Sequence, residues 1–361
     1  MMKRLITTGI LVLLLLVTAG CGSEPIAGPG AVQEPPTQSA TNHLSLPAQP
    51  RSSEPTDSVE AISEGEEIAP QSREAEPGTA ASENSFLLYL SRDFGRENLD
   101  SCQVGIISSG SLLDYMKEEW QISTGYGGGF VQGINGLTSS NSAGIRSDWF
   151  FYINGIGSPA GADQITPSPG SIVWWDYHDW NSGPGQAAVI GCYPQPFKKS
   201  GVTLVTTQRW MELAQQCRKA LGTQGIGRVD IADLHQDVSR WEQHTGPVLV
   251  IGTWIELREN SYLEKWNQAY SKNGSGIHFD EDGIELLGVN GTVQQTWREG
   301  AGVIVASGQG LGDESPLWLV AGFDDPGVEA AARVLCSQPE ELKYKYGIAV
   351  QGGKVLALPS N

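Results

Sequence analysis

The stretch WWDYHDW, residues 174–180, gathers the side chains of this chain that are best suited to chemistry. In an extended strand successive side chains point to opposite faces, so Trp174, Asp176 and His178 would share one face. An aspartate beside a histidine can orient the imidazole for metal binding or proton transfer. A metal site usually needs a third ligand, and no other histidine is near in the sequence. The pair therefore favours a structural or ligand-contacting hydrogen bond, and we expect neither a catalytic residue nor a metal.

The opposite face of the same strand would carry Trp175, Tyr177 and Asp179. A half-buried strand normally shows apolar residues on one side only, whereas this one has aromatic residues on both. One face must pack inside its own domain. The other must be covered by a ligand, by a protein partner or by a neighbouring part of the chain. Tryptophan and tyrosine suit all three covers, because they offer a large apolar area and a polar group.

A glycine-rich segment, GYGGGF at residues 125–130, is the second feature that can meet a ligand. It lacks the Lys-Ser/Thr of a phosphate-binding P-loop and the strand-to-helix context of a dinucleotide fingerprint. Its glycines allow a close backbone approach, either to a ligand or to the aromatic strand. We predict a ligand site between this segment and the aromatic strands, formed by Tyr126, Gly127, Gly128, Phe130, Trp149, Trp174, Trp175, Tyr177 and His178.

Short strands and one helix are expected to position these residues. Apolar positions recur at helical spacing over residues 111–120, with Ser109 or Ser111 as the N-cap. Asn154-Gly155 lies between apolar runs and predicts the tight turn of a hairpin. The pattern is typical of a small α+β domain, with further strands expected in SFLLYLSRDFG, CQVGII, DWFFYING and SIVWWDYHDW.

These segments occur in an order that resembles the bacterial DUF4430 family, the transcobalamin-like C-terminal domain, over residues 85–197. The quoted matches are SRDFGRE, GSLLDYMKE, TGYGGGFVQGINGL, DWFFYINGI, PGSIVWWDYHDW and AVIGCYPQPF. The resemblance implies a β-grasp-like fold and capture of a small molecule. It also implies cobalamin or another corrinoid as a candidate ligand, since the related vertebrate carriers close this domain over one face of a corrinoid. Those carriers complete their site with a large helical domain, which this sequence lacks.

From residue 201 onward, apolar strands alternate with helical patterns, including expected helices at 209–222 and 231–244. This alternation predicts an α/β domain with a mainly parallel sheet over residues 201–361. Ligands of open α/β sheets bind at the carboxyl ends of the strands. Thr253, Trp254 and residues 307–313 are therefore a second, weaker candidate site.

The first 21 residues predict export. Lys3 and Arg4 precede a short apolar run, and TAG stands directly before Cys21, which resembles a bacterial lipoprotein cleavage site. We expect cleavage and lipidation at Cys21; the alternative is an uncleaved N-terminal anchor. Residues 22–84 are rich in Pro, Ser and Glu, which predicts a disordered tether. Both alternatives place the folded part at the extracytoplasmic side of the cell membrane.

Charge and cysteine content narrow the partners further. The net charge is −18 and no sizeable basic cluster is present, which argues against nucleic acid. The four cysteines beyond Cys21 show no zinc-binding spacing. Two alternatives stay open for them: disulfides Cys102–Cys192 and Cys217–Cys336, or unpaired buried thiols.

The sequence thus predicts a lipid-anchored extracytoplasmic protein that captures a small molecule, with a corrinoid suspected, for uptake. No cofactor and no enzymatic activity are expected. The alternative is a cell-envelope protein–protein interaction module, such as the accessory subunit of a membrane transporter, without a small-molecule ligand.

Overall fold

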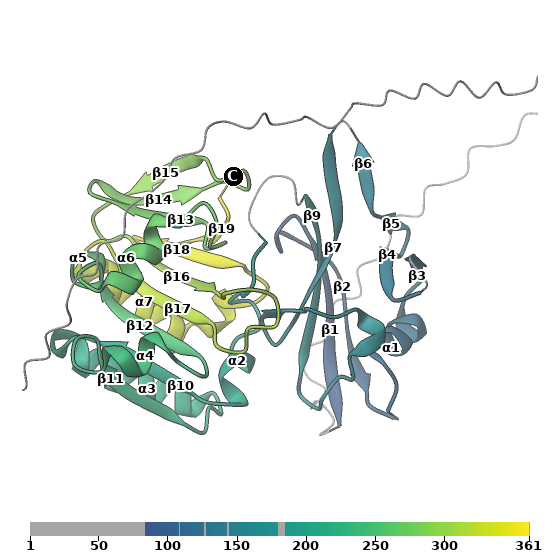
Figure 1. Cartoon of the computed structure of the whole chain (residues 1–361), viewed down its shortest axis with the longest axis horizontal. Coiled ribbons are helices and arrows are strands. Elements are labelled where there is room, and N and C mark those ends of the chain that lie inside the picture. The colour runs from purple at the N-terminus through teal and green to yellow at the C-terminus, as the bar shows by residue number, and fades with distance from the viewer. Residues whose placement is uncertain (1–83, 108, 126–127, 143, 180–184, 361) are drawn as a thin grey trace, which may run out of the picture. The chain divides into compact units, whose positions relative to one another are not determined.

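The computed structural model describes residues 84–107, 109–125, 128–142, 144–179 and 185–360. All of them fall within one compact unit, Ile68–Asn361. Helices and four sheets are present in these ranges (Figure 1), so the expected mixed α+β class is confirmed. The predicted anchor at Cys21 and the tether up to residue 83 lie outside the described residues.

The first sheet contains the aromatic strands. Its order is β2 (Glu97–Gly105), β1 (Ser85–Arg92), β9 (Ile172–Asp179), β7 (Ile145–Ile153) and β6 (Ser140–Ser142), and β8 (Ile156–Gly157) also pairs with β7. Strands β1 and β9 are parallel, and the other pairs are antiparallel. Asn154 and Gly155 have φ values of 53° and 85° and turn β7 into β8, as the sequence predicts.

One helix covers one face of this sheet. Helix α1 (Leu112–Glu119) begins at the N-cap Ser111, which forms a capping box with Asp114. Its buried side chains share a core cluster with residues of β1, β7 and β9, including Trp149 and Trp175. A small sheet of β3 (Ile122–Gly125), β4 (Phe130–Ile134) and β5 (Leu137–Thr138) and a 3-10 turn, η1 (Ala162–Gln164), complete this part.

A seven-stranded sheet organises the rest of the described chain. Its order is β11 (Val229–Asp233), β10 (Val202–Thr206), β12 (Val248–Thr253), β17 (Leu317–Gly322), β16 (Gly302–Ser307), β18 (Gly347–Gln351) and β19 (Lys354–Leu358). The first four strands are parallel, whereas β16, β18 and β19 pair antiparallel. The sheet is therefore mixed, and the expectation of a mainly parallel sheet holds for one half of it.

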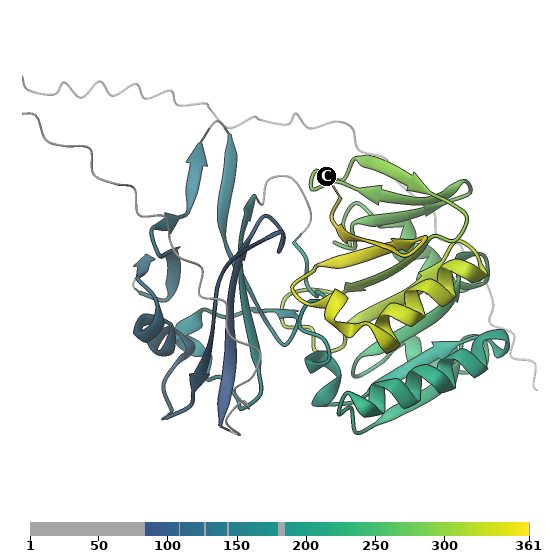
Figure 2. The same ribbon diagram turned by 180° about the vertical axis from the view of Figure 1, so that it is seen from behind.

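Helices cover both faces of this sheet. Helices α3 (Met211–Thr223) and α7 (Asp325–Ser337) pack on one face (Figure 2). The other face packs against α5 (Trp254–Leu257), α6 (Ser261–Gln268) and a three-stranded sheet of β13 (Ile277–Asp280), β14 (Gly283–Leu287) and β15 (Val293–Trp297). The remaining short elements are α2 (Gln195–Lys198), η2 (Gln208–Trp210), α4 (Val238–Glu242) and η3 (Pro339–Leu342). In the described ranges, no helix has the length and apolarity needed to span a membrane.

Two expectations for this part are wrong. The helix expected at 231–244 is a strand up to Asp233 followed by the short α4, because β11 pairs with β10. The second candidate site does not assemble either. Thr253 aligns with Gly322, whereas Ser307 aligns with Leu317 at the other end of β17, since β16 runs antiparallel.

Candidate functional site

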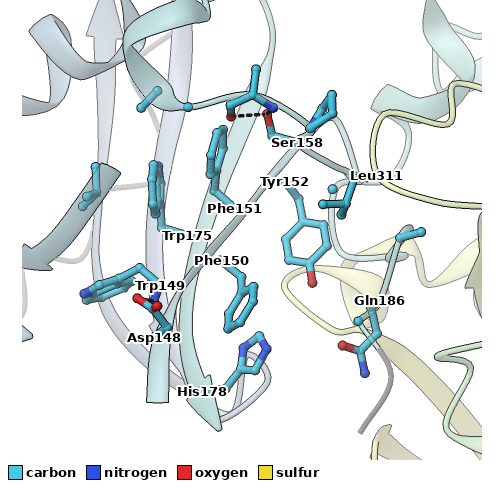
Figure 3. A pocket seen from close by; sticks show the side chains of 18 of the residues that line it. Asp148, Trp149, Phe150, Phe151, Tyr152, Ser158, Trp175, His178, Gln186 and Leu311 are labelled. Atoms are coloured by element: carbon cyan, nitrogen blue, oxygen red, sulfur yellow. Dashed lines mark hydrogen bonds between the residues drawn. The ribbon is translucent and has the colours of Figure 1, made fainter. Parts of the chain in front are cut away.

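An aromatic cavity of about 610 Å³ lies at the edge of the first sheet (Figure 3). Four of its aromatic residues are consecutive in β7, from Trp149 to Tyr152, and Trp175 and His178 come from the neighbouring β9. Loops close the rest of the wall: residues 157–162, 185–187, and Gly310 with Leu311. Phe94, Gly129, Phe130, Val131, Asp148 and Asp179 complete the lining.

The cavity reaches around the edge of β7 and contacts both faces of the strand. Phe151 aligns with Trp175 and shares the face that carries α1, whereas Phe150 aligns with Asp176 and shares the face of His178. Both Phe150 and Phe151 line the cavity. A ligand can contact both faces of a strand only where that strand has a free edge.

Trp175 supplies an unused hydrogen-bond donor to this wall. Its side chain is only 3% exposed and stacks on Phe151, with ring centroids 4.3 Å apart and planes at 14°. Its Nε1 atom is buried and has no hydrogen-bond partner among the described residues. An indole N–H can only donate, and leaving a buried donor unpaired costs about 1–3 kcal/mol. A ligand with an acceptor atom would remove that cost.

His178 lines the cavity and is held rigidly. Its Nδ1 atom lies 2.7 Å from Oδ2 of Asp176. Its ring is sandwiched between Phe94 and Phe150, at centroid distances of 4.2 Å and 4.3 Å. The pair that the strand periodicity places on one face therefore does meet. Within the described part of the chain, no three His, Cys, Asp or Glu side chains are grouped as a metal site would require.

Asp176 is fully buried and engaged on several sides. Its carboxylate accepts hydrogen bonds from the backbone N–H groups of Phe94, at 3.0 Å, and Gly95, at 2.9 Å. The hydroxyl groups of Ser91 and Tyr346 also donate to it. Burial, with the Asp176 charge second, raises the pKa of Tyr346 and keeps its hydroxyl protonated as a donor. The carboxylate thus fixes the imidazole and the turn after β1.

The face of β9 that carries Trp174 is closed by the chain itself. Trp174 has no exposed surface and packs in a cluster with Tyr89, Tyr152 and Tyr346. Its Nε1 atom donates to Oγ of Ser91 at 2.7 Å. The sequence left three possible covers open for an aromatic face: a ligand, a protein partner or a neighbouring part of the chain. Trp174 is covered by a neighbouring part of the chain.

The structure brings four of the expected ligand residues to the cavity: Phe130, Trp149, Trp175 and His178. Trp174 is enclosed elsewhere, and Tyr177 donates its hydroxyl to the carbonyl of Thr138 at 2.8 Å. Gly128 is outside the lining. Tyr126 and Gly127 lie outside the described residues. The lining residues that the sequence reasoning missed include Phe150, Phe151, Tyr152, Gln186 and Leu311.

Part of what was missed had a signal in the sequence. Like WWDYHDW, the stretch DWFFY at residues 148–152 does not alternate apolar with polar residues. It also places aromatic residues on both faces of its strand. The same reasoning applied to it would have indicated a second strand in contact with the cavity. Leu311, by contrast, comes from the loop after β16 and only tertiary packing brings it to Gly157.

The glycine-rich segment is close to its neighbours where it is described. A Cβ atom on Gly161 would lie 3.0 Å from the carbonyl oxygen of Gly129 and 2.6 Å from Oδ1 of Asp163. Both glycines line the cavity. At Gly161 the absent side chain therefore allows its loop to approach the backbone of Gly129.

Comparison with known proteins places one family in this region. Residues 110–179 match the family model of DUF4430, a domain of unknown function, in agreement with the resemblance found in the sequence. Among solved structures, the chain is similar to a "putative metal binding protein" from Ruminococcus gnavus, at 16% sequence identity and a TM-score of 0.23. That similarity covers 27% of this chain and 98% of the other. No curated protein matches this chain.

Proposed function

We propose that this protein is a binding protein whose cavity at β7 holds a small, largely apolar molecule with a hydrogen-bond acceptor. The observation that carries the proposal is the aromatic wall of the cavity, where the buried Nε1–H of Trp175 is also unpaired among the described residues. A volume of about 610 Å³ is in the range of small-molecule sites, which combine an apolar lining with a few polar groups. The family resemblance implies cobalamin or another corrinoid as a candidate, but a corrinoid is larger than this cavity and carries polar amide side chains, so the titration tests it as a separate candidate.

The proposal is for binding without catalysis. Asp176 is occupied by two backbone N–H groups and by His178, so it is not free to act as a base on a ligand. Asp176 holds His178 through Nδ1, so the imidazole is oriented toward the cavity lining, where we propose that it forms a hydrogen bond to the ligand.

The test is a titration of the compact unit, residues 68–361, with cobalamin, other corrinoids and a panel of flat aromatic carbonyl compounds. Binding is followed by calorimetry and tryptophan fluorescence. Trp175→Phe keeps a ring but removes the donor, so affinity should fall by about 1 kcal/mol. The control Trp266→Phe removes a tryptophan whose Nε1 is bonded to Ser307, outside the cavity lining, and should leave affinity unchanged.

A second variant tests the location. Ala160 lines the cavity, and Ala160→Trp would fill part of it. Binding that survives this substitution at full strength, or a panel in which nothing binds, contradicts the proposed site.

A specific observation favours the alternative function, an interaction module that meets a protein such as a transporter subunit. Two cavity residues, Phe130 and Leu311, are 40% and 61% exposed. Large apolar side chains in water often mark a protein-binding surface. Under this alternative, Phe130→Ser and Leu311→Ser would abolish association with the partner, and the small-molecule panel would not bind to the wild type.

The place of action proposed here is the outer side of the cell membrane, with Cys21 as the lipid-anchored residue. Its support is the signal pattern before Cys21. In a detergent partition of the full-length protein, Cys21→Ser should move the protein to the aqueous phase or block its processing. A processed variant that stays in the detergent phase would rule out lipidation at Cys21.

A further inference from the structure

The outer edge of β7 is incompletely paired. Strand β6 aligns with Ile145–Ser147 and β8 aligns with Tyr152 and Ile153. Between them, residues 148–151 have no strand partner on that edge in the described ranges. These residues also line the cavity. An unpaired stretch of strand presents a row of backbone donors and acceptors.

The ladder tells which backbone groups face the open edge. In an antiparallel pair, the residues next to a two-residue hairpin turn exchange both backbone hydrogen bonds, so Ile153 points its N–H and C=O toward β8. Alternation then directs the backbone groups of Phe151 and Trp149 to the same edge. The bond from the Ser158 N–H to the Phe151 carbonyl, 3.1 Å long, agrees with this assignment.

Two of these four groups are already satisfied. The Trp149 N–H donates to Oδ1 of Asp148 at 2.8 Å, and the Phe151 carbonyl accepts from Ser158. The Trp149 carbonyl and the Phe151 N–H have no hydrogen-bond partner among the described residues. One acceptor and one donor therefore flank Phe150 on an edge that opens into the cavity.

This spacing matches one residue of a parallel strand. In a parallel ladder, a residue of one strand lies beside one residue of the other strand. Its N–H donates to the carbonyl of the residue before that neighbour, and its carbonyl accepts from the N–H of the residue after that neighbour. We propose that the ligand of this cavity is a short extended peptide that adds to the edge of β7 beside Phe150. This inference rests on the proposed binding function and names the chemical class of the ligand.

The size and lining of the gap define the peptide. The gap spans at most four residues of strand, roughly 13 Å. Strands β6 and β8 block the edge on either side, Ser139 bonds to Asp148 at one end, and Ser158 bonds to the Phe151 carbonyl at the other. The peptide therefore has two or three residues. Its side chains alternate between the two faces of β7 and meet aromatic rings on both, so apolar or aromatic residues fit best.

The test uses N-acetyl-phenylalanine N-methylamide and its leucine and tryptophan counterparts as probes, with residues 68–361 as the protein. Amide hydrogen exchange is followed by NMR. The Phe151 N–H should exchange at least about tenfold more slowly at saturation, because the probe carbonyl accepts from it. The Ile153 N–H, which already faces β8, is the matched control and should not change.

A second arm removes the donor from the probe. Methylation of the probe's own α-nitrogen deletes the N–H that would bond to the Trp149 carbonyl, and affinity should fall about three- to tenfold. Equal affinity of the methylated probe, or an unprotected Phe151 N–H at saturation, overturns the pairing. If amide-free aromatic compounds bind while all three probes fail, the peptide class is wrong and the binding function stands. If nothing binds, both are wrong.

Discussion

The indole of Trp174 and the ring of Tyr346 meet edge to face, with centroids 5.1 Å apart and planes at 73°. The Tyr346 hydroxyl also donates to Asp176, 3.3 Å away and 170 positions earlier in the chain. Tyr89 and Tyr344 stack beside them, with planes at 6°. These contacts join β9 to the segment before β18, so the aromatic strand is completed by residues of the C-terminal part.

The first prediction concerns the isolated segment 85–197, which contains the first sheet and helix α1. The cluster around α1 is internal to it, whereas removal of Tyr344 and Tyr346 would expose Trp174. We expect a dispersed amide spectrum but a melting temperature below that of residues 68–361. In the longer chain, Tyr346→Ala should lower the melting temperature in the same direction. A collapsed spectrum of the isolated segment would mean that the C-terminal part is required for folding.

The second prediction separates the two tryptophans at the start of β9. Both are buried, so Trp174→Ala and Trp175→Ala should each reduce the free energy of unfolding by about 3–5 kcal/mol. Replacement by Phe should distinguish them, because Trp174 loses a bond to Ser91 and Trp175 loses none. Urea unfolding measures the free energy of unfolding of the four variants, the Ala and the Phe replacement at each position. A Trp175→Ala variant as stable as the wild type would contradict the burial of Trp175.

The third prediction concerns the cysteines. The Sγ atoms of Cys217 in α3 and Cys336 in α7 are 3.0 Å apart, whereas Cys102 and Cys192 belong to different core clusters. Oxidised dithiothreitol should convert the first pair to a disulfide and stabilise the fold by about 2–4 kcal/mol. Peptide mapping by mass spectrometry identifies the linkage. Cys102 and Cys192 should stay thiols, because burial raises the pKa of each to about 12. A Cys102–Cys192 linkage, or the absence of a Cys217–Cys336 linkage after oxidation, would contradict this prediction.

The fourth prediction is a pH dependence that originates at His244. Both ring nitrogens are buried without a described hydrogen-bond partner, and burial lowers the pKa of this imidazole. The unfolded chain then binds the proton more readily, so the free energy of unfolding should decrease as the pH falls below about 6.5.

The measurement is the melting temperature of the wild type and of His244→Leu between neutral and mildly acidic pH. The difference between the two slopes should follow the His244 titration. The exposed Gln236 provides the control, since Gln236→Leu introduces the same side chain but removes no ionisable group. Equal slopes for the wild type and His244→Leu would show that the histidine titrates alike in the folded and unfolded chain.

The sequence alone determined the local structure of this protein well. Helix α1 with its cap at Ser111, the Asn154-Gly155 turn and the pairing of Asp176 with His178 depend on neighbours a few positions apart. The family resemblance at 110–179 likewise rests on contiguous segments. Two-sided aromaticity in β9 correctly indicated that both of its faces would be covered.

Tertiary structure decided which residues provide that cover and where the cavity lies. Tyr346 reaches Trp174, and Leu311 reaches the cavity, only because strands far apart in the sequence pack together. The free edge of β7 is likewise invisible in a sequence, since the alternation of side chains is the same in a paired and an unpaired strand. Strand direction separated Thr253 from Ser307, because an apolar run has the same composition whichever way it runs in the sheet.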